Sequence, residues 1–193
     1  PFTKKPDQTI TANGVTPGVN IADVDSDGNA DLYFTKIKLG FWKIVQNLIS
    51  KRVTLDTSIY LLQNDSRYPD DPDFLLKTDY KINLTHKIRF QGTWPTIKSD
   101  FNKDGLIDLL VARDDKIEIF LNTLSENLFS KPFVQSGVVT SPFMQITDLN
   151  NDGFNDLIFY EKKRNGELSV LLNKGIWKNI FPSVRDKKSN NDN

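Results

Sequence analysis

The chain has 193 residues with 25 acidic and 25 basic side chains, and this zero net charge gives no sign of a nucleic-acid-binding protein. Cysteine is absent, which excludes disulfides, thiolate metal sites and cysteine nucleophiles. Aspartate accounts for 21 of the 25 acidic residues. Because aspartate favours turns, helix caps and cation sites over helix interiors, this bias predicts a chain of strands and loops.

The remaining composition narrows the chemistry further. One histidine, His86, makes a histidine-based zinc site implausible, and no apolar run approaches the roughly 18 residues of a membrane span. Neither a glycine-rich phosphate loop nor a cluster typical of a catalytic site is present in the sequence. The sequence therefore predicts no catalytic residue and no organic cofactor.

Three segments share the pattern D-x-[DN]-x-D-G-x-x-D-L, in which x is any residue. They lie at 23–32, 100–109 and 148–157. Each is preceded by a proline and a short apolar segment, and each is followed by two β-prone runs. Three matches with matching flanks indicate an internal repeat. The repeat units cover about residues 17–90, 93–140 and 141–182.

The first repeat has an insertion at about residues 37–57, between predicted strands at 31–35 and 58–64. Apolar side chains in the insertion recur at helical spacing, and lysine or arginine occupies several of the positions between them. We predict a short basic amphipathic helix. Three roles are open to it: covering an edge or face of its sheet, docking a partner, or lying on a membrane surface.

The second and third repeats are shorter and more regular. Their predicted strands cover 109–113, 116–122, 157–160 and 167–173. The dipeptide Asn165-Gly166 between the last two strands is a strong hairpin signal. Each second strand ends in asparagine, as does the corresponding strand of the first repeat. This regularity supports an all-β repeat protein.

The chemistry of the three loops points to a cation. Oxygens at loop positions 1, 3, 5 and 9 can converge on one ion, with the backbone carbonyl of position 7 as a further ligand, and glycine at position 6 permits the sharp bend. Hard oxygen ligands suit Ca²⁺. The candidate ligands are Asp23, Asp25, Asp27, Asn29, Asp31, Asp100, Asn102, Asp104, Leu106, Asp108, Asp148, Asn150, Asp152, Phe154 and Asp156. We expect the first loop, which has four aspartates, to bind most tightly.

Two alternatives, an EF-hand and a set of solvated turns, explain the three loops less well than Ca²⁺-binding loops between strands do. An EF-hand begins in the same way but needs a bidentate glutamate at position 12, where this chain has Phe34, Val111 and Phe159. Solvated turns would account for one such loop, but not for three in register. Carboxylates crowded together without a cation also repel one another.

The loop motif resembles the FG-GAP/VCBS repeat family, whose members form the blades of integrin-α-like β-propellers. The resemblance covers about residues 1–182 and is closest to the bacterial VCBS style, because the Phe-Gly and Gly-Ala-Pro elements are not intact. It implies four-stranded antiparallel blades, with the acidic loop joining the first two strands and holding a structural Ca²⁺, up to three ions in all. Residues 1–16 would be the outer strand of a preceding blade, and residues 183–193 a disordered polar tail.

Three repeats cannot close a propeller ring, which needs about 4–8 blades. We expect the chain to be a fragment of a longer protein. The alternatives are a ring completed by other subunits and an open arc docked on a partner.

The resemblance implies a non-catalytic, calcium-binding module of protein interaction, adhesion or assembly, secreted or at the cell surface, with the periplasm as a further location. A protein partner would contact the propeller face or the insertion helix, at 37–53. Carbohydrate is a further candidate ligand, whereas neither nucleic acid nor a membrane span is expected. The alternative functions are an accessory or substrate-binding part of a secreted carbohydrate-active enzyme and a structural subunit of an extracellular assembly.

Overall fold

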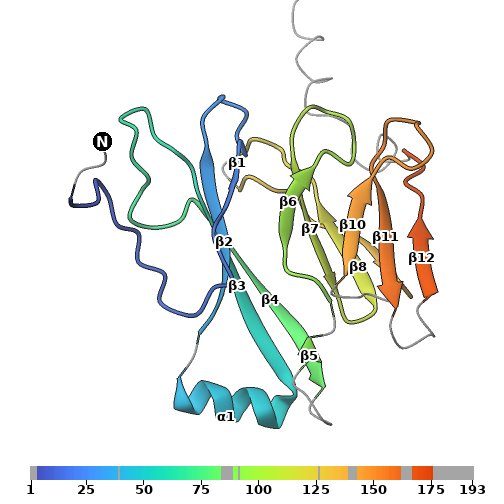
Figure 1. The fold of residues 1–193 in the computed structure, drawn as a ribbon, viewed down its shortest axis with the longest axis horizontal. Helices are drawn as coiled ribbons and strands as arrows, with labels where there is room; N and C mark the ends of the chain where they lie inside the picture. Colours follow the sequence, from blue (N-terminus) through green and yellow to red (C-terminus); the bar gives the residue numbers. More distant parts are fainter. Residues whose placement is uncertain are drawn as a thin grey trace, which may run out of the picture. The chain divides into compact units, whose positions relative to one another are not determined.

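The computed structural model describes residues 4–38, 40–83, 89–90, 92–125, 127–138, 143–161 and 167–175. The chain forms two compact units, Pro1–Gln91 and Gly92–Asn193. The described residues form three antiparallel sheets and one short helix, and none of the sheets closes into a barrel (Figure 1). The predicted all-β fold with one helical insertion is confirmed.

The first unit holds a five-stranded meander in which every strand pairs with the next along the chain. Its strands are β1 (Asn20–Ala22), β2 (Asp31–Ile37), β3 (Arg52–Tyr60), β4 (Phe74–Asn83) and β5 (Arg89–Phe90). Core side chains pair across neighbouring strands: buried Tyr33 lies opposite buried Ile59, and buried Val53 lies opposite buried Tyr80. The sheet has one strand more than the predicted four, because the end of β4 pairs with β5.

Helix α1 (Phe41–Ser50) connects β2 to β3 and is shorter than the predicted insertion. Strand β3 begins at Arg52, well before the predicted start at residue 58. The physical reason is a run that is mostly buried and rich in β-branched residues from Val53 onward, which extends the pairing with β4. Lys51, in a left-handed conformation with φ of 52°, ends the helix.

The first unit departs from one of the three roles considered for the helix and from the strand expected at the N-terminus. No side chain of α1 is buried, so the helix does not cover a face or edge of its sheet in the described residues. Residues 4–19 contain no strand, only an isolated bridge between Val15 and Ile37, so the expected outer strand over 1–16 is not formed in its described part.

The second unit holds two sheets. The first consists of β6 (Thr96–Ser99), β7 (Asp108–Arg113), β8 (Lys116–Phe120) and β9 (Phe133–Ser136). The second consists of β10 (Met144–Thr147), β11 (Asp156–Glu161) and β12 (Glu167–Leu171). Both sheets contribute to one hydrophobic core, in which Phe101, Leu110 and Ile117 pack with Leu157 and Phe159.

Several sequence-based predictions lie outside the described residues. They are His86, the Asn165-Gly166 hairpin turn and the polar tail at 183–193. Among the residues that the structure describes, no helix is long and apolar enough to cross a bilayer.

Candidate metal centre

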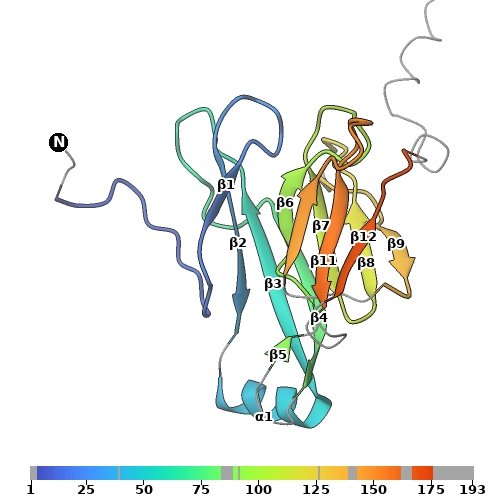
Figure 2. The same ribbon diagram turned by 45° about the vertical axis from the view of Figure 1, so that its right-hand side comes forward.

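Each acidic loop joins the first two strands of its sheet: β1 to β2, β6 to β7 and β10 to β11 (Figures 1 and 2). The three loops repeat the same backbone conformation. Gly28, Gly105 and Gly153 at position 6 have φ of 86°, 90° and 81°, a region that other residues rarely adopt. Position 4 is also left-handed in every loop, with φ near 60°. The repeated sequence therefore folds into one repeated local structure.

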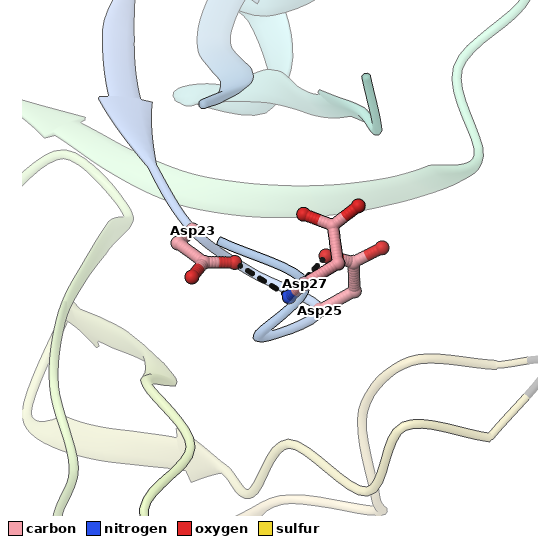
Figure 3. A group of neighbouring side chains, drawn as sticks. All are labelled: Asp23, Asp25 and Asp27. Atoms are coloured by element: carbon pink, nitrogen blue, oxygen red, sulfur yellow. Dashed lines mark hydrogen bonds between the residues drawn. The ribbon is translucent and has the colours of Figure 1, made fainter. Parts of the chain in front are cut away.

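The first aspartate of each loop folds the chain back on itself. The carboxylate of Asp23 accepts a hydrogen bond from the backbone N–H of Asp27 at 3.1 Å (Figure 3). It accepts another from the N–H of Gly28, also at 3.1 Å. Asp100 accepts the equivalent pair in the second loop, and Asp148 accepts the N–H of Gly153 at 2.7 Å in the third. Position 1 is thus held at the centre of each loop.

In the first loop the structure brings three predicted ligands together. One carboxylate oxygen each of Asp23, Asp25 and Asp27 lies within 4.8 Å of the others. Burial and the nearby charge of Asp31 raise the pKa of Asp25. The pKa of Asp27, in contrast, is lowered by hydrogen bonds from the side chain and backbone of Asn29. The loop therefore concentrates negative charge where a divalent ion could neutralise it.

Positions 5 and 7 are joined in every loop. The N–H of Asn29 donates to Asp27 at 2.7 Å, and Leu106 and Phe154 donate to Asp104 and Asp152 in the same way. These bonds hold position 7, whose carbonyl is the predicted ligand, next to the carboxylate of position 5.

The aspartate at position 9 has a role that the motif did not reveal. Asp31, Asp108 and Asp156 are completely buried. In each, one carboxylate oxygen accepts the backbone N–H of loop position 2, at 2.7–2.9 Å. The other accepts the N–H of a residue just beyond the second strand after the loop: Leu62, Asn122 or Asn173. This aspartate therefore ties the loop to the next strand end.

Burial raises the pKa of Asp108 to about 7, and the charges of Asp104 and Asp100 act in the same direction. The backbone hydrogen bonds from Asn122 and Phe101 lower it, but do not offset the burial. A cation in the loop would favour the ionised form and so lower this pKa.

The third loop provides the observation that tests whether the residues fit a cation. The Oδ1 atom of Asp148 is buried and accepts no hydrogen bond from any described residue. A buried carboxylate oxygen without a donor is costly, because it has lost its water and gained no partner. A hard cation would satisfy it. Together with the all-oxygen donor set, this fits Ca²⁺ better than zinc or copper.

The EF-hand alternative is excluded by the structure as well as by the sequence. Position 12 is occupied by Phe34, Val111 and Phe159, which are buried in β2, β7 and β11. Strands, and not helices, flank every loop.

Sequence reasoning missed Tyr68, whose hydroxyl donates to the carbonyl of Ala30 in the first loop at 2.6 Å. The backbone of Tyr68 is itself held by two hydrogen bonds with the side chain of Gln8. Tyr68 lies in a polar, proline-rich loop without any motif, and nothing in its local sequence pointed to the first acidic loop.

Lys103, at position 4 of the second loop, reaches the third loop. Its ammonium donates to the carbonyl of Asp152 at 2.6 Å and lies 3.9 Å from the centre of the Phe154 ring. The pKa of Asp152 is lowered mainly by hydrogen bonds from Phe154 and Asn150, and the charge of Lys103 contributes. The positive charge of Lys103 therefore lies next to the candidate cation site of the third loop.

Lys103→Met is expected to raise the calcium affinity of the third loop by about threefold or more, because it removes a charge that repels the ion and keeps an apolar stem against Phe154. Calorimetric titration measures the affinity, with Lys98→Met, on the exposed side of β6, as the matched control. The gain should disappear when Asp148→Ala disables the third loop. An unchanged or weaker affinity in Lys103→Met would contradict the repulsion.

Three antiparallel sheets, each with an acidic loop between its first two strands, define a β-propeller-type repeat protein. Residues 100–159, from the first position of the second loop to position 12 of the third, match the family model of the FG-GAP-like repeat. The chain therefore carries an FG-GAP-like repeat, and the resemblance drawn from the loop motif is confirmed over these residues. Comparison with curated proteins found no match, and comparison with solved structures found none either.

Proposed function

We propose that the chain is a non-catalytic, calcium-binding β-propeller-type module of protein interaction, adhesion or assembly, secreted or at the cell surface. FG-GAP-like repeats are generally protein-interaction modules that are typical of extracellular proteins, which supports the general role. The proposal of calcium binding is supported mainly by the repeated conformation of the three loops, together with the buried Oδ1 atom of Asp148, which accepts no hydrogen bond from a described residue.

The bound ions would stabilise the fold. Calcium would neutralise the crowded carboxylates at the junction between the first two strands of each sheet, where positions 1, 3, 5 and 9 and the carbonyl of position 7 would hold it. The backbone hydrogen bonds of the position 9 aspartates then connect each filled loop to a second strand end. The result is a rigid scaffold whose exposed surfaces are free for recognition.

Extracellular calcium modules commonly have dissociation constants of about 10⁻⁴–10⁻³ M. Sites of this strength would be filled at millimolar calcium and largely empty at cytosolic concentrations. The expected affinity therefore supports a secreted or surface location.

Removing calcium is expected to lower the melting temperature. At about tenfold excess over the dissociation constant, each site contributes about 1.4 kcal/mol to the free energy of unfolding. Scanning calorimetry with calcium and with a chelator measures the difference. Asp27→Ala should remove the stabilisation that calcium gives through the first loop. Asp70→Ala, in an exposed position without a loop motif, should leave the stabilisation by calcium unchanged. A melting curve that the chelator does not move would refute the proposal.

A further inference from the structure

Helix α1 exposes an apolar face that nothing in the described first unit covers. Trp42, Ile49 and Phe41 are 80%, 79% and 73% exposed, and Ile44 and Leu48 are also exposed. The helix lies at one end of the strands of the first unit (Figures 1 and 2). Large aromatic and aliphatic side chains at this level of exposure are typical of a binding surface.

The helical geometry gathers these side chains on one side. At about 100° per residue, the six apolar residues of α1 fall within about half of the helix circumference. Its four polar residues, Lys43, Gln46, Asn47 and Ser50, share the other half. Phe41 and Trp42 also contact each other edge to face, with ring centres 5.4 Å apart. The helix therefore presents a broad apolar strip.

Basic residues surround this strip. The segment from residue 37 to residue 55 contains no aspartate or glutamate, but four cations, Lys38, Lys43, Lys51 and Arg52. A fifth cation, Lys81, lies opposite Arg52 in the register of β3 and β4. Lys38 pairs with buried Asp56 at 3.2 Å. Asp79 lies opposite Thr54 on the same pair of strands, so five cations face two acidic side chains, Asp56 and Asp79, and this end of the sheet carries a net positive charge.

The other end of the same sheet is acidic. Strand β2 runs from Asp31, at the end of the first metal loop, to Ile37, beside α1. The loop at 61–73, which holds four aspartates, lies between β3 and β4 at the same end as Asp31. The first unit is thus polarised along its strands, although the net charge of the chain is zero.

We propose that α1 docks the first unit on an anionic lipid surface, with its apolar strip at the boundary between headgroups and acyl chains and with Lys43 of the helix and Lys51 just beyond it among the lipid phosphates. Amphipathic helices with aromatic and aliphatic residues on one side and lysine on the other bind membranes in this way. A protein partner is less favoured, since lysine is depleted at protein interfaces and most of these cations are lysines. The inference goes beyond the proposed function and does not depend on calcium binding.

The test is co-sedimentation of the full chain with phosphatidylcholine vesicles that contain about 30% phosphatidylserine, in about 0.1 M salt and with chelator present. Binding is expected to these vesicles and to be at least about tenfold weaker to phosphatidylcholine alone. The chelator ensures that calcium does not bridge the acidic loops to the lipid.

Two variants locate the contact. Trp42→Ser combined with Ile49→Ser should weaken binding at least about tenfold, as should Lys43→Glu combined with Lys51→Glu. The matched control is Leu168→Ser combined with Val170→Ser, a pair of exposed apolar residues on β12 that should leave lipid binding unchanged. Circular dichroism and thermal melts show whether each variant is folded.

Quenching of Trp42 by brominated lipid gives a second readout, which the Trp42→Ser variant should lose. Absence of vesicle binding by the wild-type chain would overturn the proposal and favour a protein partner for α1. Equal binding by the Trp42 and Ile49 double variant, or no preference for anionic lipid, would overturn it as well.

Discussion

Asp108→Ala is expected to lower the free energy of unfolding by about 3 kcal/mol, even in calcium-free buffer. The substitution leaves two buried backbone N–H groups without an acceptor, those of Phe101 and Asn122, which donate to Asp108 at 2.7 Å and 2.9 Å. Urea denaturation measures the change. Asp115→Ala is the control, because Asp115 is exposed in the turn between β7 and β8. This substitution should change the free energy of unfolding by no more than about 0.5 kcal/mol.

The same variant should alter the dependence of stability on pH. Burial raises the pKa of Asp108 to about 7 in the folded state, against about 3.9 in the unfolded chain. Between these values the folded state binds more protons, so the stability contributed by Asp108 is present at low pH and is lost as the pH rises toward 7. Calcium should reduce this loss because it favours the carboxylate. If Asp108→Ala has the same free energy of unfolding as the wild-type chain, with the same dependence on pH, then position 9 does not have the structural role inferred for it.

Phe159→Ala is expected to cost about 3–5 kcal/mol of unfolding free energy, the largest effect of any single substitution considered for this chain. Phe159 is completely buried on β11, in the core that also contains Phe101, Leu110 and Leu157. Removing its ring leaves a cavity between the two sheets of the second unit, since the rigid strands around it can close only partly.

Calorimetric melting measures this loss, and Phe143→Ala is its control. Phe143 is 65% exposed and packs edge to face against the Tyr160 ring, so its removal should cost less than about 1 kcal/mol. A small effect of Phe159→Ala would mean that the two sheets do not share a core. Position 12 is therefore an anchor of the hydrophobic core, where an EF-hand would have a metal ligand.

The loop motif predicted the parts of the structure that depend on neighbouring residues. Glycine at position 6 and alternate acidic side chains define the local fold, so the three loops and the strands that follow them were foreseeable from the sequence. The partners of position 9 were not. Asp31 binds the N–H of a residue 31 positions away, and the corresponding separations for Asp108 and Asp156 are 14 and 17 positions.

The insertion shows the same limit. Helical spacing predicted an amphipathic helix, and α1 is one. Periodicity identifies which side chains share a face, but not what that face contacts, because this depends on the placement of the flanking strands. The early start of β3 was missed since the periodicity of the helix and the alternation of the strand meet at Lys51 without a glycine or proline to separate them.

Lys103 has a consequence for how such repeats evolve. Its ammonium belongs to one repeat and rests on the ion loop of the next. Copying or transplanting the third repeat alone would separate that loop from the charge beside it, and the grafted copy would inherit a different ion affinity. The third repeat is therefore not an independent module, because its acidic loop is contacted by a side chain encoded in the gene segment that precedes it.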